Sequence, residues 1–199
     1  MRLSLYNQVE ALYKYADNPV KRVGTGFAAI DELIVGPAPG EVCMVVGRSY
    51  AGKSIVGQNI VYNNPNTASI FFSMEMPFMQ ALVRMYSMWS DTPSNEVQAS
   101  LEAGNPHKDI WRLVEAFPKH VIVDQPAISL EEMSIALNEY ADAFGERPEF
   151  VIVDYLELLG GAKASGEGYL ATERQATMLK DWAKVEDMRV FLLHQANKL

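Results

Sequence analysis

Cysteine, long apolar runs and basic charge are all scarce in this 199-residue sequence. The single cysteine, Cys43, cannot form an internal disulfide, which is typical of a chain in a reducing compartment. No apolar run approaches the ~20 residues that a membrane-spanning helix needs, so we expect no membrane span. The first 18 residues alternate polar and apolar side chains and lack the hydrophobic core of a signal peptide. These absences together predict a cytoplasmic protein.

Acidic residues outnumber basic ones, with 25 Asp and Glu against 17 Lys and Arg, for a net charge of −8. This balance argues against a protein that coats nucleic acid with a basic face. It does not exclude contact with DNA through a few loops, for example inside an assembled ring. The apolar fraction of 49% and the charged fraction of 21% are those of a globular chain.

Signals for zinc binding and for covalent catalysis are also missing. The histidines lack the spacing of zinc ligands with one another and with Cys43. No G-x-S-x-G motif or Cys/His pairing indicates a covalent nucleophile. The histidines are His107, His120 and His194.

Short apolar runs alternate along the chain with segments of helical spacing. Runs that are apolar on both faces, separated by helices, predict a mainly parallel sheet covered by helices on both faces, which is an α/β fold. The predicted strands are 42–46, 69–72, 121–123, 150–153 and 190–193. The predicted helices are 53–62, 78–89, 109–117, 130–144 and 170–186.

An amphipathic helix is predicted at the start of the chain, since apolar residues recur at helical spacing over 5–16 and Pro19 ends the pattern. We therefore divide the chain into a helix or linker over residues 1–19 and a main domain over residues 20–199. The apolar stripe of this helix fits two alternatives equally well, docking on its own domain and docking on a neighbouring subunit.

Residues 47–54, G-R-S-Y-A-G-K-S, match the phosphate-binding P-loop G-x-x-x-x-G-K-[ST]. The glycines let successive backbone N–H groups point at a phosphate, and the following helix adds its positive N-terminus. Lys53 adds a full charge for the β- and γ-phosphates, and Ser54 offers a hydroxyl to Mg²⁺. The motif predicts binding of ATP and Mg²⁺. The loop residues are Gly47, Arg48, Ser49, Tyr50, Ala51, Gly52, Lys53 and Ser54.

Polar side chains follow three other predicted strands. Asp154 ends the run at 150–153, where a carboxylate suits the water shell of Mg²⁺. Glu75 follows the second strand and Gln195 follows the last. Ligands of open α/β sheets bind at the carboxyl ends of strands, so these groups are expected to meet at the γ-phosphate. Glu75 suits the general base that accepts a proton from the attacking water.

Several motifs resemble the DnaB-type replicative helicases. Residues 73–77, S-M-E-M-P, with Arg84 after them, resemble the family's S-L-E-M-P…R segment. Arg48 lies where the family's A-R-P-S-M-G-K-T loop has its arginine. Residues 154–158, D-Y-L-E-L, are similar to D-Y-L-Q-L, and residues 25–31, T-G-F-A-A-I-D, resemble T-G-F-x-x-L-D.

The matching motifs run in the family's order from about residue 23 to residue 199. The resemblance implies that residues 20–199 form a RecA-like P-loop NTPase core, and that the protein is a hexameric homo-oligomer that hydrolyses ATP and moves along single-stranded DNA. The glycine-rich segment Gly160 to Gly168 corresponds to a loop that faces DNA in the family, and Lys163 is its only basic residue.

The resemblance also implies roles for individual residues. Lys53 and Ser54 would bind nucleotide and Mg²⁺, and Asp154 would position the metal. Glu75 would be the catalytic base, and Gln195 would sense the γ-phosphate. Ser54 replaces the family's threonine, which the chemistry tolerates. Where the family has glutamine and serine, this chain has Glu157 and His194, to which the resemblance gives no role.

The sequence stops just past the last predicted strand, before the point where the family has its arginine finger and a second DNA loop. An arginine finger is worth ~10³–10⁵ in rate. We therefore expect a chain that lacks the C-terminal part of the family's core, binds ATP with Mg²⁺ and turns it over slowly. The family's primase-interacting amino-terminal domain has no counterpart here either.

Two other functions share the P-loop. A RecA- or RadA-like recombination ATPase would form filaments on single-stranded DNA, and the missing amino-terminal helicase domain leaves this alternative open. The S-M-E-M-P segment favours the helicase. A small-molecule kinase would need an acceptor pocket and lid arginines, and the pairing of Glu75 with Gln195 is better explained by attack of water.

Overall fold

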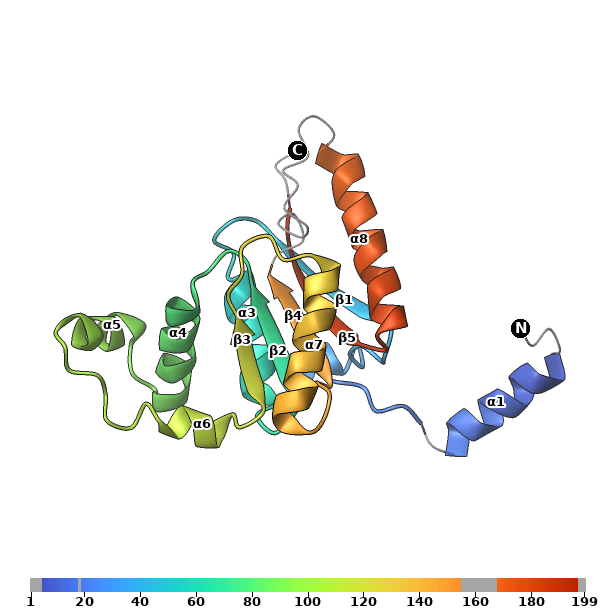
Figure 1. Ribbon diagram of the computed structural model, residues 1–199, viewed down its shortest axis with the longest axis horizontal. Coiled ribbons are helices and arrows are strands. Elements are labelled where there is room, and N and C mark those ends of the chain that lie inside the picture. The colour runs from blue at the N-terminus through green and yellow to red at the C-terminus, as the bar shows by residue number, and fades with distance from the viewer. Residues whose placement is uncertain (1–4, 18, 155–167, 197–199) are drawn as a thin grey trace.

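A computed structural model describes residues 5–17, 19–154 and 168–196 (Figure 1). At its centre is a five-stranded sheet in the order β1-β5-β4-β2-β3, and each recorded strand pairing is parallel. The prediction of a mainly parallel sheet is confirmed. The strands are β1 (Val42–Gly47), β2 (Ser69–Ser73), β3 (His120–Val123), β4 (Phe150–Asp154) and β5 (Arg189–Gln195).

Helices cover both faces of this sheet, as predicted. Helices α3 and α4 lie on one face, and α7 and α8 lie on the other (Figure 1). The helices are α1 (Leu5–Asp17), α2 (Ala28–Asp31), α3 (Lys53–Asn63), α4 (Phe78–Ser90), α5 (Ser94–Glu102), α6 (Arg112–Ala116), α7 (Leu130–Phe144) and α8 (Gly168–Val185). Within the described ranges, none of them is long and apolar enough to cross a membrane.

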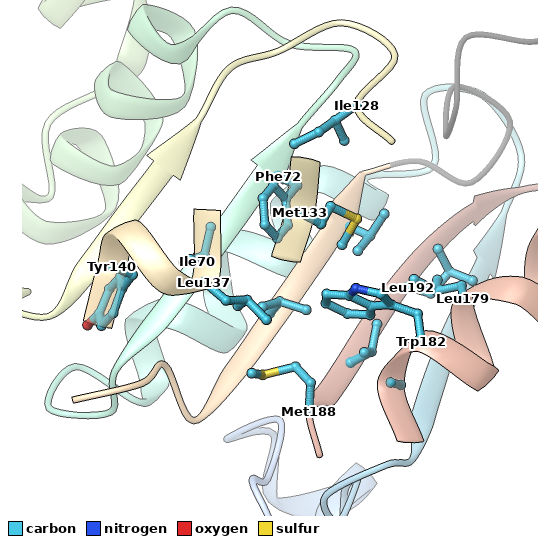
Figure 2. Close-up of a cluster of buried hydrophobic side chains, with 14 of the residues drawn as sticks. Ile70, Phe72, Ile128, Met133, Leu137, Tyr140, Leu179, Trp182, Met188 and Leu192 are labelled. Carbon is cyan, nitrogen blue, oxygen red and sulfur yellow. The ribbon is translucent and has the colours of Figure 1, made fainter. Parts of the chain in front are cut away.

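The core forms two layers because successive strand residues face opposite sides of the sheet. On β2, Ile70 and Phe72 pack toward α7 and α8, whereas Phe71 packs toward α3 and α4. Figure 2 shows the first layer, where Leu137 of α7 and Trp182 of α8 lie over the strands. Both faces of the central strands are therefore buried, which explains why the middle of each of these strands is apolar on both faces.

Three segments differ from the sequence-based prediction. The short helix α2 (Ala28–Asp31) was not predicted, and it has no buried residue. The helix α5 (Ser94–Glu102) was not predicted, because it packs against the core through only two apolar residues, buried Val97 and partly buried Leu101. The predicted helix at 109–117 is shorter, covering Arg112–Ala116. At its start, the N–H groups of Arg112 and Leu113 donate to the carbonyls of Asp109 and Ile110, three residues back, as in a tighter 3₁₀-type turn.

Helix α7 begins at a capping box formed by Ser129 and Glu132. The Ser129 side chain accepts a hydrogen bond from the Glu132 N–H, and the Glu132 carboxylate accepts one from the Ser129 N–H at 2.7 Å. That backbone hydrogen bond from Ser129 is the main cause of the lowered pKa of Glu132. The helix ends at Gly145, whose φ of 73° is left-handed and favours glycine. Local sequence thus fixes both ends of this helix.

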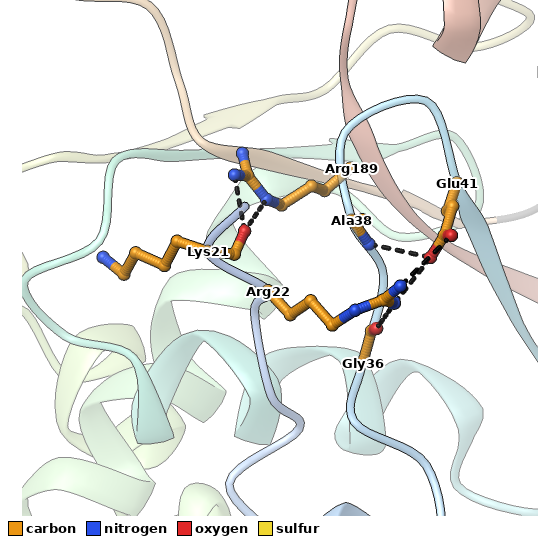
Figure 3. Close-up of polar contacts among 6 residues, drawn as sticks. All are labelled: Lys21, Arg22, Gly36, Ala38, Glu41 and Arg189. Carbon is orange, nitrogen blue, oxygen red and sulfur yellow. Dashed lines mark hydrogen bonds and ion pairs between the residues drawn. The ribbon is translucent and has the colours of Figure 1, made fainter. Parts of the chain in front are cut away.

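The segment before β1 is tied to the sheet by arginines (Figure 3). The Arg22 guanidinium donates to the Gly36 carbonyl and to the Glu41 carboxylate, each at 2.7 Å. Arg189, at the start of β5, donates to the Lys21 carbonyl at 2.7 Å. These bonds hold residues 21–41 beside β1, the strand that leads into the phosphate loop.

Helix α1 lies away from the sheet in Figure 1. Its side chains Leu5, Leu12 and Tyr13 are exposed. The helix agrees with the pattern read at 5–16, whereas the division of the chain into a linker over 1–19 and a core over 20–199 stays a prediction.

Helix α3 contacts the sheet through the backbone of Gly57. A Cβ atom added there would lie 3.0 Å from Leu193 Cδ1, 3.1 Å from Phe71 Cε2 and 3.3 Å from Ile152 Cγ2. These side chains come from β5, β2 and β4, so the glycine lets the helix lie against the middle of the sheet. Its position places the N-terminus of α3 at the carboxyl end of the strands.

Gly57→Ala is expected to destabilise the fold. Overpacking of a core lowers the free energy of unfolding by about 1–3 kcal/mol. The better helix propensity of alanine raises it by at most ~1 kcal/mol. A net loss of about 1 kcal/mol in the free energy of unfolding should therefore appear in urea titrations. Asn59→Ala, on the same helix outside the buried core, is the matched control and should change stability by less than about 0.5 kcal/mol. Equal stability of both variants would contradict this packing.

Candidate nucleotide-binding site

The carboxyl ends of four strands meet at one edge of the sheet. Gly47 at the end of β1 pairs with Gln195 at the end of β5, and the Ala196 N–H donates to the Gly47 carbonyl at 2.9 Å. Ser73 at the end of β2 pairs with Asp154 at the end of β4. Strand β5 lies between β1 and β4, so Gln195 projects from between the phosphate loop and Asp154.

The phosphate loop connects β1 to α3. Gly52 has a φ of 86°, a left-handed conformation that glycine adopts without strain, and α3 begins at the next residue, Lys53. The Lys53 ammonium lies over the loop and donates to the Arg48 carbonyl at 3.0 Å. Tyr50 also has a positive φ, 60°, and its side chain is fully exposed. The loop therefore presents its backbone and Lys53 on one side.

A cavity of about 450 Å³ opens beside this loop, within the size range of small-ligand sites. Its walls combine groups from three segments that lie far apart in the sequence. Ser49 to Ser54 come from the loop and the start of α3, Glu75 follows β2, and Gln195 ends β5. The structure thus brings Lys53, Ser54, Glu75 and Gln195 together at one cavity.

Glu75 is positioned by the turn that follows β2. The Met74 N–H donates to the Asp154 carbonyl at 2.9 Å, and the Ser73 hydroxyl donates to the Met76 carbonyl. These bonds hold the turn next to β4 and leave Glu75 exposed in the cavity wall. At the end of β5, Gln195 Nε2 donates to Ser49 Oγ at 2.6 Å. A carboxylate and an amide therefore face the same space as Lys53.

Asp154 is fully buried beside the cavity. Among the residues that the structure describes, neither of its carboxylate oxygens has a hydrogen-bond partner. Burial is the main cause of its raised pKa, and the charge of Glu75 raises this pKa further. The Ser54 hydroxyl and the Lys53 charge lower it, although the Ser54 contact falls short of hydrogen-bond geometry. A buried carboxylate with unused oxygens is costly unless a cation compensates it.

These residues fit a magnesium ion. Hard oxygen donors are the ligands that Mg²⁺ prefers, and it is usually held by one or two protein groups plus substrate phosphates. The Ser54 hydroxyl and the Asp154 carboxylate supply such donors side by side. In the described ranges, no group of three or more His, Cys, Asp or Glu could hold a metal by itself. Nucleotide phosphates and water would supply the remaining ligands.

Two polar residues that line the cavity have no role in the sequence-based prediction. Gln80 and Arg84, both on α4, line the cavity together with the phosphate loop. Arg84 was noted only as part of a motif, and Gln80 was missed. The sequence does contain a sign of their shared position: Gln80 and Arg84 are four residues apart on the helix that follows Glu75, and this spacing places both on one helix face. The segment Gly160 to Gly168 with Lys163 lies outside the described residues, apart from Gly168 at the start of α8.

An all-parallel sheet, a glycine-bent phosphate loop and a carboxylate at the end of a neighbouring strand define a P-loop NTPase with the RecA-like fold. Comparison with known proteins identifies the family to which the chain belongs within this class. The family model for the DnaB-like helicase C terminal domain matches residues 22–199, and the chain belongs to that family. Membership favours the helicase over the recombinase alternative.

Curated relatives agree with this family. The replicative DNA helicase DnaB of Leifsonia xyli subsp. xyli is 26% identical over 201 residues, which covers 96% of this chain and 42% of the relative. The replicative DNA helicase DnaB of Helicobacter pylori is 25% identical over 187 residues, covering 90% of this chain and 37% of the relative. The chain thus spans about two fifths of the length of these relatives.

Solved structures show the same fold. The ATPase domain of G40P superposes with a TM-score of 0.79 at 19% identity, covering 100% of this chain and 73% of that chain. A DnaB-like replicative helicase, described with its interactions with primase, gives a TM-score of 0.75 at 20% identity and is covered over 49% of its length. The predicted RecA-like α/β fold is confirmed.

Asp154→Asn should stabilise the fold while it removes metal binding. The substitution replaces a buried charge that has no hydrogen-bond partner in the described residues with a neutral side chain of similar shape. In buffer with a chelator, the melting temperature of the variant is expected to exceed that of the wild type. Addition of ATP with Mg²⁺ should raise the melting temperature of the wild type and have little effect on the variant.

The control for this change is Asp142→Asn on the exposed side of α7. It should alter neither the melting temperature in chelator nor the response to ATP with Mg²⁺. A variant at position 154 that melts earlier than the wild type in chelator would show that the carboxylate stabilises the fold by contacts other than a cation.

Proposed function

We propose that this chain is the ATPase core of a DnaB-type replicative helicase. It binds ATP with Mg²⁺, hydrolyses the terminal phosphate with water, and couples hydrolysis to movement along single-stranded DNA as part of a homo-hexameric ring. One observation carries the proposal: the phosphate loop, Glu75 and Gln195 line a single cavity, with buried Asp154 beside it.

The chain's own groups divide the work of hydrolysis. Loop N–H groups and Lys53 bind the phosphates, and Ser54 and Asp154 hold the metal. Bound Mg²⁺ neutralises charge that develops on the phosphates. Glu75 accepts the proton of the attacking water. Gln195 exchanges its bond to Ser49 for one to the terminal phosphate.

Contact with DNA is assigned to the segment Gly160 to Gly168, with Lys163 as its basic residue. It follows Asp154 closely in the sequence, so metal binding and DNA contact involve one stretch of chain. A net charge of −8 suits this arrangement, because a ring needs few contacts from each subunit when symmetry multiplies them.

Electron microscopy with single-stranded DNA and the β,γ-imido analogue of ATP tests the assembly. Closed six-fold particles are the expected result. Helical filaments would instead support a recombination ATPase, and monomers that ignore DNA would contradict both functions. The same preparation allows ATP hydrolysis to be measured with and without single-stranded DNA, and the expected result is stimulation by DNA.

Turnover by the dilute chain is expected to be slow. In a ring ATPase an arginine supplied across a subunit interface is worth ~10³–10⁵ in rate, and a lone subunit has no neighbour to supply it. Hydrolysis that is already fast in a monomeric preparation without DNA would contradict this expectation.

A further inference from the structure

A side-chain hydrogen bond joins the phosphate loop to the end of β5. Gln195 Nε2 donates to Ser49 Oγ at 2.6 Å, although the two residues lie 146 positions apart in the sequence. Both residues line the nucleotide cavity. The bond therefore ties the loop to the side chain that is expected to contact the terminal phosphate, and Ser49 is in a position to control that contact.

The backbone of β5 fixes the direction of Gln195. Gly47 pairs with Gln195, and the Ala196 N–H donates to the Gly47 carbonyl at 2.9 Å. Leu193, two positions before Gln195, packs in the core layer on the side of α3. Because side chains alternate along a strand, Gln195 points to that same side. Its amide thus lies on the side of the sheet where the phosphate loop and α3 are found.

Two hydrogen bonds to one carbonyl hold the loop around Ser49. The Arg48 carbonyl accepts from the Ala51 N–H at 3.2 Å and from the Lys53 ammonium at 3.0 Å. These bonds close a turn whose second residue is Ser49. The Ser49 hydroxyl and the Gln195 amide are therefore both carried by backbone that is held in place.

The bond to Ser49 holds the amide that the terminal phosphate needs. In the mechanism proposed above, Gln195 leaves Ser49 and donates to that phosphate. When a bond must break before a ligand is fully bound, the apparent affinity falls with the fraction of molecules that are ready to bind. ADP has no terminal phosphate that requires this move, so its affinity should not depend on the bond.

This contact is a feature of the chain itself. The loop motif A-R-P-S-M-G-K-T of the family has proline at the position of Ser49, and a proline side chain accepts no hydrogen bond. A role for the Ser49 hydroxyl therefore does not follow from the motif. It follows from the bond that the structure records between the loop and β5.

We propose that Ser49 holds Gln195 on the phosphate loop until a terminal phosphate replaces the serine, and thereby lowers the preference of the site for ATP over ADP. Ser49 acts through Gln195 and is a positioning residue. The inference rests on the proposed nucleotide-binding function and adds to it a residue that sets the selectivity between the two nucleotides.

The test is the affinity of Ser49→Ala for two probes, ADP and the β,γ-imido analogue of ATP, each with Mg²⁺, by calorimetric titration. Alanine keeps the backbone N–H of the loop and removes the hydroxyl. The affinity for the analogue should rise about 2- to 10-fold, the size expected when one neutral competing hydrogen bond is removed. The affinity for ADP should stay unchanged.

A double-mutant cycle shows whether the effect passes through Gln195. In a Gln195→Ala background the bond is already absent, so Ser49→Ala should change neither affinity. A gain that persists in this background would refute the inference, because it would come from the loop alone. Ser94→Ala is the matched control: Ser94 is an exposed serine at the start of α5, and its loss should change neither affinity.

Three results for Ser49→Ala would overturn the inference. These are an unchanged affinity for the analogue, equal gains for ADP and the analogue, and a lower affinity for the analogue, which would mean that the serine orients Gln195 toward the phosphate instead of withholding it. If Ser49→Ala fails to fold, Ser49→Gly also removes the hydroxyl and is decided by the same outcomes.

Failure of this inference can be told from failure of the proposed function. A wild-type chain that binds neither ADP nor the analogue would refute nucleotide binding altogether. A wild-type chain that binds both, with a Ser49→Ala variant that is indistinguishable from it, would refute only the role of Ser49.

Discussion

Lys53→Ala is expected to weaken binding of both ATP and ADP about 10- to 100-fold, because a charge-assisted contact to phosphate is worth about 1.5–3 kcal/mol. The ammonium lies over the phosphate loop, 3.0 Å from the Arg48 carbonyl, and the cavity offers it no protein carboxylate other than Glu75 among the described lining residues. Loss of the charge would leave the loop N–H groups and the N-terminus of α3 as the phosphate ligands. Calorimetric titration with Mg²⁺ present measures both affinities.

Lys184→Ala provides the comparison for this variant. Lys184 is an exposed lysine on α8 with a long contact of 4.0 Å to Asp181, so its loss should change neither nucleotide affinity nor stability. Unchanged affinity of Lys53→Ala for ATP would contradict the nucleotide site itself, since Lys53 is the charged side chain that the described loop residues contribute to the cavity lining.

Glu75→Gln should abolish most of the hydrolysis while nucleotide binding survives. A positioned general base contributes about 10²–10⁴ in rate, and glutamine keeps the shape of the side chain but accepts no proton. The negative charge of Glu75 also raises the pKa of buried Asp154, so its removal relieves repulsion at the metal side of the site. Affinity for ATP with Mg²⁺ should therefore be kept or improved. Single-turnover hydrolysis at saturating ATP, together with titration by the β,γ-imido analogue, separates the two effects.

The matched substitution is Glu96→Gln on the exposed surface of α5. It should leave both the hydrolysis rate and the affinity as they are in the wild type. A loss of affinity in Glu75→Gln as large as its loss of rate would indicate that the carboxylate binds nucleotide and has no special part in proton transfer. An unchanged rate would remove Glu75 from the mechanism.

The strands could be predicted because burial on both faces leaves an unmistakable pattern. Segment 150–153 is apolar at every position and segment 69–72 at every position after Ser69, and turn residues or helical patterns separate such runs. The order of the strands in the sheet could not be predicted from the sequence. The lateral position of β5 between β1 and β4 follows from pairings between residues more than 30 positions apart, such as Gly47 with Gln195. Periodicity carries no information about such pairings.

In the site, too, features set by neighbouring residues could be predicted, whereas features set by contacts between distant segments could not. The phosphate loop could be found because its chemistry lies within eight consecutive residues, and Glu75, Asp154 and Gln195 could be placed because strand ends share one edge of a parallel sheet. Arg84 could not be given a role, since its direction depends on how α4 packs against α3 through Gln58 and Ala81. The DNA-binding role of Lys163 stays a prediction.

The close contact between the backbone of α3 at Gly57 and the sheet limits which positions of this core can be changed by design. With Leu193, Phe71 and Ile152 already close to the position of a missing Cβ, even the smallest side chain has no room, and a mutant library should keep this position constant. Tyr50 and Gln80 face the nucleotide cavity with exposed side chains. Diversity placed at those two positions would alter the preference for nucleotides without disturbing the helix that carries the phosphate loop.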